Sequence, residues 1–265
     1  MTAKDTGTAW QDKVALVTGA AGGIGRAVVR ALAERGTRVA AVDRDGDALR
    51  KRVAELARQG LPVTAYPADV TDAAGVEALV AAVESGLGPV EYLVNAAGTL
   101  RVGEVRELSG QDWADMFAVN ASGVFHTSRA VVDRMVPRGR GALVTVASNA
   151  ASTPRAKMAA YAASKAAATM FTKSLGLEVA RYGIRCNVVA PGSTETPMLW
   201  SMWHDDEGRA RTLGGSAEDF RVGIPLGRTA RPEDVAAAVL FLLSEQAGHV
   251  TLHELTVDGG AALGA

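Results

Sequence analysis

The chain has 265 residues, of which 48% are hydrophobic and 22% are charged, and its net charge at pH 7 is -1. This balance lacks the basic excess that nucleic-acid binding requires, so we expect no nucleic-acid partner. No run approaches the ~18 apolar residues of a membrane span, and the polar segment 1–13 lacks the apolar core of a secretory signal. We therefore expect a cytoplasmic protein without a membrane partner.

Few side chains offer metal or redox chemistry. The only cysteine, Cys186, lies in an apolar run, so we expect a buried structural thiol and no intramolecular disulfide. The four histidines show no paired spacing of metal ligands. The sequence therefore predicts no metal site.

Short strand-like runs alternate with amphipathic helical segments along the chain. Several runs are continuously apolar, among them VALVT and ALVTV, as expected of strands covered on both faces of a sheet. The pattern predicts a single-domain α/β fold, a Rossmann-like doubly wound parallel sheet of about seven strands with helices on both faces. We expect the strands near residues 13–18, 37–42, 62–66, 90–95, 141–147, 184–190 and 253–257.

The first predicted strand is followed by a glycine-rich turn, TGAAGGIG, which leads into a helix. Gly19 allows a tight exit from the strand, while Gly23 and Gly25 let the backbone approach a pyrophosphate at the helix N-terminus. The spacing is GxxxGxG rather than GxGxxG, which is a different dinucleotide fingerprint. The cofactor residues predicted in this turn are Thr18, Gly19, Gly23, Ile24 and Gly25.

An acidic residue, Asp43, ends the second predicted strand, roughly at the ~20-residue offset where a carboxylate binds the adenosine ribose hydroxyls. A carboxylate at this position repels a 2′-phosphate. The adjoining Arg44 is able to turn toward such a phosphate, but the glycine turn itself contains no Lys or Arg. The pattern favours NAD over NADP as the cofactor.

Residues after the later strands complete the predicted cofactor site. Asp69 and Val70 follow the third strand, where a carboxylate acceptor and an apolar wall would border the adenine; the competing role for Asp69 is a helix N-cap. The motifs VNAAG and PGST end the fourth and sixth strands with small residues that let a cofactor lie against the backbone. The cofactor residues predicted in these two motifs are Asn95, Ala96, Gly98, Pro191, Gly192 and Thr194.

Tyr161 and Lys165 lie four residues apart in YAASK, so a helix places both side chains on one face. A phenol with a pKa of about 10 becomes a base at neutral pH only when a neighbouring positive charge lowers that pKa. We therefore expect the Lys165 ammonium to favour ionised Tyr161, and Ser148, which ends an apolar strand, to hydrogen-bond the same substrate oxygen. A YxxxK pair alone is more often a surface pair. Here it follows the glycine turn, Asp43, the NAAG motif and Ser148 in order, which indicates hydride transfer.

One long segment, about 193–227, departs from the alternation of strands and helices. It contains large apolar residues, including Met198 and Trp200, followed by charged and glycine-rich residues. After a strand of an open α/β sheet, such a segment would cover a ligand at the carboxyl edge. We expect a substrate lid, with packing between subunits as the alternative.

The order of these motifs is similar to that of the classical short-chain dehydrogenase/reductase family, and the resemblance extends from Lys13 to the last residue. It implies one dinucleotide-binding catalytic domain over 1–265, with Ser148, Tyr161 and Lys165 as catalytic residues. It also implies that Tyr161 and Lys165 contact the cofactor and that Asn120 kinks its helix and holds a water that links Lys165 to solvent. A homotetramer built on the helices around 109–134 and 157–182 is a further implication.

Within this family, the chain resembles the aromatising dehydrogenases of catechol siderophore biosynthesis in segments such as VNAAGTLRVG, VTVASNAASTPR and IRCNVVAPGSTETPM. This resemblance implies NAD-dependent oxidation of 2,3-dihydro-2,3-dihydroxybenzoate to 2,3-dihydroxybenzoate. A carboxylate substrate needs a positive charge near Tyr161, and a guanidinium can bind it bidentately. The predicted substrate residues are Arg155, Arg101, Met198 and Ser148.

Three alternatives stay open at this point. The same residues suit oxidation of trans-2,3-dihydro-3-hydroxyanthranilate to 3-hydroxyanthranilate in an antibiotic pathway, because the two substrates differ by one group. An NADPH-dependent carbonyl reductase of the same family is disfavoured by Asp43 and Arg155. A non-catalytic dinucleotide-binding sensor would be expected to lose Ser148, Tyr161 or Lys165, and all three are present.

Overall fold

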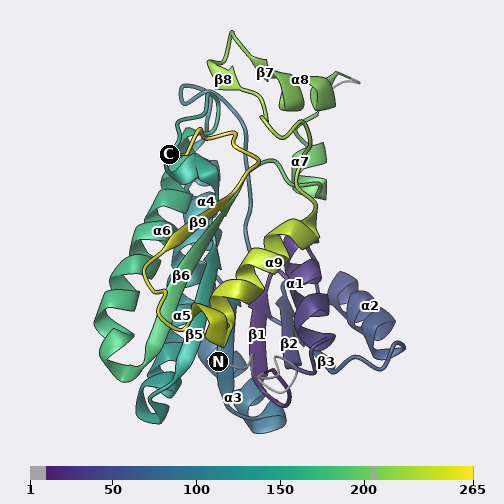
Figure 1. The fold of residues 1–265 in the computed structure, drawn as a ribbon, viewed down its shortest axis with the longest axis vertical. Helices are drawn as coiled ribbons and strands as arrows, with labels where there is room; N and C mark the ends of the chain where they lie inside the picture. Colours follow the sequence, from purple (N-terminus) through teal and green to yellow (C-terminus); the bar gives the residue numbers. More distant parts are fainter. Residues whose placement is uncertain (1–9, 204–206, 265) are drawn as a thin grey trace, which may run out of the picture.

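A parallel sheet of seven strands forms the centre of the molecule. The structure is a computed structural model that describes residues 10–203 and 207–264. The strand order is β3-β2-β1-β4-β5-β6-β9 (Figure 1), and all neighbouring strands of this sheet are parallel. The predicted doubly wound sheet is therefore confirmed. Its strands are β1 (Val14–Thr18), β2 (Arg38–Asp43), β3 (Val63–Pro67), β4 (Val90–Asn95), β5 (Gly141–Val146), β6 (Ile184–Pro191) and β9 (Glu254–Val257).

Helices cover both faces of this sheet. The main α-helices are α1 (Gly23–Ala33), α2 (Gly46–Ala57), α3 (Ala73–Leu87), α4 (Gly110–Phe117), α5 (Gly123–Met135), α6 (Ala159–Val179) and α9 (Pro232–Leu243). A π-helical turn, η1 (Ala118–Ser122), joins α4 to α5. The short 3-10 turns are η2 (Val136–Arg138), η3 (Asn149–Ala151), η4 (Ala180–Tyr182) and η5 (Glu245–Ala247).

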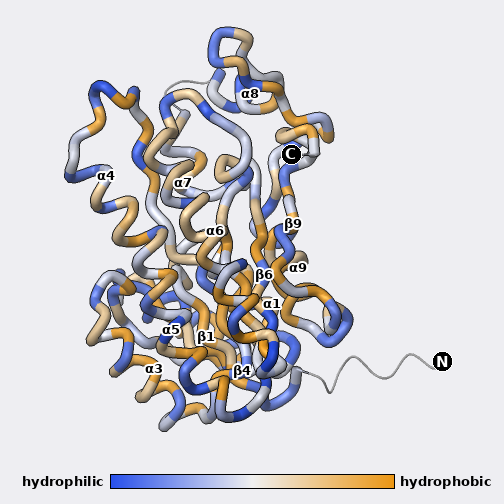
Figure 2. Tube along the Cα trace, turned by 90° about the vertical axis from the view of Figure 1, so that its left-hand side faces the viewer, coloured by the Kyte–Doolittle hydropathy of each residue, from blue (hydrophilic) through white to orange (hydrophobic). Residues whose placement is uncertain are grey.

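The apolar strands are buried because successive side chains point to opposite faces, and each face has its own helices. Ala15 and Val17 belong to a core formed with α1, α2 and α9. Val14 and Leu16 belong to a second core formed with α3, α5 and the end of α6. Figure 2 shows the apolar residues gathered along the strands and the hydrophilic ones on the outer helices and loops.

Cys186 is fully buried within β6, as the sequence predicts, and burial raises the pKa of its thiol to about 12. No group of three metal-binding side chains occurs in the described ranges. None of the helices in residues 10–203 and 207–264 combines the length and apolar character needed to cross a membrane.

The strand order reverses between β1 and β4, which is where open α/β sheets form a crevice at their carboxyl ends. The glycine turn follows β1 and the NAAG motif follows β4, so the fold brings these two motifs together. Ser148, the predicted catalytic serine, follows β5, and the PGST motif begins at the last residue of β6. All of the predicted site motifs therefore lie at one edge of the sheet.

The predicted lid segment rises above this edge, where Figure 1 shows α7, α8, β7 and β8 beyond the ends of the strands. Its elements are α7 (Pro197–Trp200), α8 (Gly208–Gly214), and β7 (Gly215–Ser216) paired antiparallel with β8 (Arg221–Val222). The two ends of the segment are joined, because the Ala230 amide donates to the Ser193 carbonyl at 3.0 Å and the Glu195 amide to the Ala230 carbonyl at 2.9 Å. Residues 204–206 of this segment lie outside the described ranges.

Candidate active site

The turn between β1 and α1 is built for close backbone contact. Gly19 has φ of +66°, and a Cβ there would lie 2.6 Å from the Ala96 carbonyl oxygen. A Cβ on Gly25 would meet the Gly19 carbonyl oxygen. The first turn of α1 has no side-chain cap and no acidic residue, so its amide groups are available to an anion. This arrangement fits the pyrophosphate of a dinucleotide.

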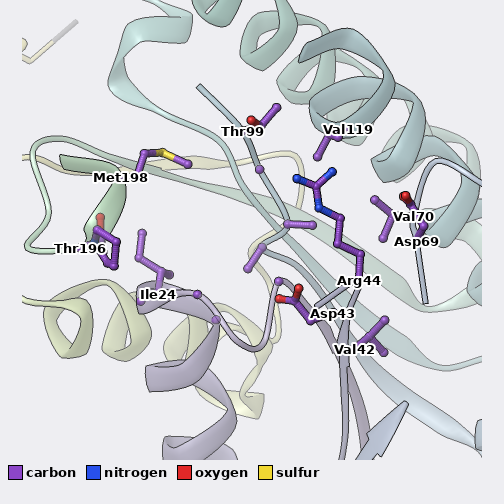
Figure 3. Close-up of a pocket in the computed structure, with 18 of the residues that line it drawn as sticks. Ile24, Val42, Asp43, Arg44, Asp69, Val70, Thr99, Val119, Thr196 and Met198 are labelled. Atoms are coloured by element: carbon purple, nitrogen blue, oxygen red, sulfur yellow. The ribbon is translucent and has the colours of Figure 1, made fainter. Parts of the chain in front are cut away.

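A cleft of about 270 Å³ lies against this turn (Figure 3). Its walls come from the ends of β1, β2, β3 and β4 and from the start of the lid segment. Most of the predicted cofactor residues therefore lie together around one cavity. Those that line it are Gly19, Gly23, Ile24, Gly25, Asp43, Asp69, Val70, Ala96 and Gly98.

The acidic residues of this cleft are held by the backbone. Asp43 accepts hydrogen bonds from the Ala21 amide at 3.0 Å and the Asp45 amide at 3.1 Å, which fixes its carboxylate at the end of β2. Asp69 accepts from the amide and the hydroxyl of Thr71 at 2.9 and 2.8 Å. Asp72, not Asp69, caps α3, so the competing role proposed for Asp69 is wrong. Arg44 projects into the same cleft, as Figure 3 shows.

Two predicted cofactor residues, Thr18 and Asn95, are buried outside the cleft lining. The Thr18 hydroxyl accepts hydrogen bonds from the Ala96 and Ala97 amides at 3.1 and 3.2 Å. The Asn95 side chain donates to the Ser128 hydroxyl at 2.9 Å and accepts from Thr127. Both residues thus fix the turns that line the cleft instead of lining it themselves.

A second, smaller cavity of about 140 Å³ adjoins the first. Ile24, Thr196 and Met198 line both cavities, so the two are contiguous at the start of the lid segment. An apolar cavity of about 150 Å³ holds one benzene ring, so the second cavity suits a substrate with a single ring. Predicted residues that line it are Ser148, Arg155, Tyr161, Pro191, Gly192, Thr194 and Met198.

All three predicted catalytic side chains are buried. Ser148 and Tyr161 line the second cavity, whereas Lys165 lines neither cavity. Burial raises the pKa of the Tyr161 phenol, and a hydrogen bond with the Ser148 side chain opposes that rise. Burial also lowers the pKa of Lys165 to about 8. The Lys165 ammonium lies 5.9 Å from the centre of the Tyr161 ring and donates to the Val146 carbonyl at 2.9 Å. The expectation that Lys165 lowers the pKa of Tyr161 is wrong for this structure, because desolvation dominates.

Asn120 lies in the π-helical turn between α4 and α5, which agrees with the predicted kink. Its amide is fully engaged: it accepts from the Thr99 amide at 2.9 Å and donates to the Thr99 carbonyl and the Ser164 hydroxyl, each at 2.9 Å. The side chain therefore joins the NAAG strand end to the catalytic helix α6. The water-mediated link to Lys165 stays a prediction.

The two predicted carboxylate-binding arginines are placed differently. Arg155 lines the second cavity, where its guanidinium donates to the Ala261 carbonyl at 3.2 Å. Arg101 lines neither cavity; it is exposed and its Nε lies 3.6 Å from an Asp112 carboxylate oxygen. The structure therefore does not bring Arg101 to the cavity that holds Arg155, and its role in substrate binding stays a prediction.

Several lining residues are not identified by motif patterns. Thr99 and Leu100 directly follow NAAG, and Val119 directly precedes Asn120, so position beside a motif is the signal that marks them. Arg221 has no motif neighbour, and only its charge within the predicted lid distinguishes it. The remaining unpredicted apolar residues of the second cavity are Ala147, Ala150, Met158, Leu199, Met202 and Ala261.

A nucleotide cleft that opens onto buried proton-transfer groups is what a dinucleotide-dependent oxidoreductase requires. Comparison with known proteins makes this class more specific. Residues 13–207 match the family model of the short chain dehydrogenases. The chain belongs to the short-chain dehydrogenase family. It is therefore an oxidoreductase, and its cofactor is a nicotinamide dinucleotide.

Relatives and solved structures match nearly the whole chain. It is 54% identical over 254 residues to a 2,3-dihydro-2,3-dihydroxybenzoate dehydrogenase of Bacillus subtilis (strain 168), covering 96% of this chain and 97% of that protein. A protein of the same name from Escherichia coli (strain K12) is 42% identical over 249 residues, covering 94% and 96% of the two chains. The crystal structure of a short-chain type dehydrogenase/reductase from Mycobacterium marinum matches with a TM-score of 0.87 at 30% identity, covering 95% and 96%.

Proposed function

We propose that this protein oxidises 2,3-dihydro-2,3-dihydroxybenzoate to 2,3-dihydroxybenzoate with NAD+, in catechol siderophore biosynthesis. The observation that carries the proposal is the placement of Arg155 in the same single-ring cavity as Ser148 and Tyr161. That cavity offers a cationic group for an acid and a proton-transfer pair for a hydroxyl. The names of the relatives in Bacillus subtilis and Escherichia coli support the same substrate.

Binding of the ring depends on two kinds of contact. The Arg155 guanidinium binds the substrate carboxylate, with two parallel hydrogen bonds available from its planar fork. Apolar side chains such as Met158 and Met198 line the ring faces. The carboxylate contact fixes which ring hydroxyl reaches Tyr161.

Proton transfer uses the buried groups of α6. Tyr161 accepts the proton of the C3 hydroxyl as its own phenolic proton passes toward the neutral Lys165 amine, while the Ser148 hydroxyl donates a hydrogen bond to the oxygen that becomes a carbonyl. Lys165 then passes the proton on toward solvent. Bound NAD+ supplies the acceptor for the hydride that leaves C3. The cyclohexadienone that remains loses its C2 proton on tautomerisation to the catechol, and aromatisation makes the oxidation effectively irreversible.

The central test measures NAD+ reduction at 340 nm with 2,3-dihydro-2,3-dihydroxybenzoate and, separately, with trans-2,3-dihydro-3-hydroxyanthranilate. We expect faster turnover of the dihydroxy acid, with 2,3-dihydroxybenzoate identified by mass. The Tyr161→Phe variant should abolish turnover, because the phenol oxygen that accepts the proton is absent. Preference for the amine would assign the enzyme to 3-hydroxyanthranilate formation, and no turnover of either compound would contradict an aromatising function.

The choice of NAD rests on Asp43, whose carboxylate is fixed at the mouth of the cofactor cleft. Asp43→Asn removes the charge that repels a 2′-phosphate and leaves Arg44 to attract it. Because a like-charge contact costs several kcal/mol, we expect the ratio of kcat/KM for NADP+ to that for NAD+ to rise roughly tenfold or more. Asp47→Asn, an exposed change on α2, is the matched control. Equal use of both cofactors by the unmodified protein would contradict the assignment.

The pH dependence of oxidation follows from the catalytic pair. Oxidation needs the pair in its deprotonated form, and Lys165 has a pKa of about 8 while that of Tyr161 is raised. We expect kcat/KM to rise about tenfold per pH unit below this pKa and then level. Lys165→Arg should move the rising limb to higher pH, since a guanidinium does not release its proton in this range. Lys173→Arg, on the same helix, is the control; a profile without a rising limb would contradict the assignment.

We also propose a homotetramer that pairs α4, α5 and α6 between subunits. Large apolar residues are exposed on these helices; they are Trp113, Phe125, Met170 and Leu177. Light scattering should give about four times the 27.4 kDa chain mass. Leu177→Arg places a charge on this face and should lower that mass, whereas Lys51→Glu on α2 should not. A monomer in the unmodified protein would refute the assembly.

We place the protein in the cytoplasm, where NAD+ is supplied to a biosynthetic oxidation. A single buried thiol agrees with a reducing compartment. Fractionation of cells that express the protein, with activity found in the soluble fraction, tests this location.

A further inference from the structure

A second guanidinium lines the substrate cavity. Arg221 lies on β8 of the lid segment, yet it borders the same cavity of about 140 Å³ as Arg155. The two arginines also border a neighbouring cavity of about 280 Å³. The loop before α6 and the lid hairpin thus bring two positive charges to one small space.

Neither guanidinium forms an ion pair with a carboxylate of the described residues. Both side chains are half-buried, and neither has a carboxylate oxygen within ion-pair distance in the ranges 10–203 and 207–264. Arg155 donates to the Ala261 carbonyl, and Arg221 donates to the Ser193 hydroxyl at 3.0 Å, so both bonds are to neutral groups. Burial and the nearby charge of Arg155 lower the pKa of Arg221, and Asp219 opposes this shift. Burial also lowers the pKa of Arg155, and Asp258 opposes it.

The acidic groups nearby are engaged elsewhere. Asp219 lies 3.8 Å from the Lys157 ammonium and accepts from the Ser216 hydroxyl. Asp258 accepts from Asn149 at 3.1 Å and from two amides of the C-terminal turn at 2.8 Å each. Two partly desolvated like charges cost free energy unless an anion lies between them. The cavity is therefore suited to an anionic group of the ligand.

We propose that Arg221 is a second carboxylate-binding residue, which with Arg155 clamps the substrate acid and couples lid closure to its presence. The inference rests on the proposed function and names a specificity residue for it. Arg155 belongs to the body of the protein and Arg221 to the lid, so an acid bridging them holds the two parts together. A ring without a carboxylate offers no such bridge.

The bond from Arg221 to Ser193 extends this effect to the base of the lid. Ser193 follows β6, and its carbonyl accepts the Ala230 amide that joins the two ends of the segment. Thr196 and Met198, which line both cavities, lie just beyond it. Anion binding at Arg221 therefore acts on the residues where the substrate and cofactor cavities meet.

The test compares an acid and its neutral counterpart in binding and in turnover. Calorimetry measures the affinity of the unmodified protein and of Arg221→Gln for 2,3-dihydroxybenzoate and for catechol. Because a charge-assisted pair of hydrogen bonds is lost, we expect affinity for the acid to fall about 10- to 100-fold, while affinity for catechol changes by less than about twofold. The kcat/KM for 2,3-dihydro-2,3-dihydroxybenzoate should fall by a similar factor. Arg221→Lys keeps the charge and should restore part of the loss.

Arg209→Gln, which removes an exposed positive charge of α8 outside both cavities, is the matched control and should leave all values unchanged. Unchanged affinity of Arg221→Gln for the acid would overturn the inference. An equal loss of affinity for the acid and for catechol would also overturn it, because it would indicate a structural role.

The failure of the inference and the failure of the proposed function are distinguishable. If Arg221→Gln weakens binding of the acid but the unmodified protein does not oxidise the dihydroxy acid, the proposed function fails and the inference stands. If it oxidises that acid and Arg221→Gln does so equally well, only the inference fails.

Discussion

The close contact between the turn after β1 and the turn after β4 is the constraint on which the rest of the site depends. Gly19 leaves no room for a side chain against Ala96, and the Thr18 hydroxyl accepts both amides that open the second turn. Side-chain amides extend this connection: Asn95 ties the end of β4 to α5, and Asn120 ties Thr99 to α6. One hydrogen-bonded series therefore links the cofactor cleft to the helix that carries the catalytic pair.

Burial at the end of that series sets the chemistry. Desolvation favours the neutral forms of both Tyr161 and Lys165, so the phenol is a weaker acid and the amine a weaker base than in water. Of the two groups, Lys165, with a pKa of about 8, is therefore the one that exchanges its proton closer to neutral pH. The sequence pattern alone suggests a phenol ionised by a neighbouring charge. In the structure, burial is the larger influence on the pKa of each group.

Local patterns in the sequence were sufficient to predict the fold and the cofactor cleft. Continuous apolar runs predict strands covered on both faces, and motifs that directly follow those strands must meet at one sheet edge, so Gly19, Asp43, Ala96 and Ser148 are placed correctly. The direction of a side chain is harder to predict from the sequence, because it depends on contacts with residues that are distant along the chain. Thr18 points toward the backbone of another strand end. The sequence gives no reason to distinguish Arg101 from Arg155. In the structure, Arg101 lies beside Asp112 outside both cavities, whereas Arg155 donates to the Ala261 carbonyl and lines the second cavity.

The two cavities are built from different parts of the chain, which separates cofactor binding from substrate choice. Most of the cofactor cleft comes from strand ends of the first half, and most of the substrate cavity from the loop before α6, the lid and Ala261, while Ile24, Thr196 and Met198 line both. Asn149 lines the second cavity, and its side-chain amide donates a hydrogen bond to Asp258. The charges that face the ring are then those of Arg155 and Arg221. An alkyl amine is protonated at neutral pH, so a 2-ammonium group would meet two guanidinium ions, whereas a 2-hydroxyl would not. The electrostatics of the cavity thus favour the dihydroxy acid over its amino counterpart.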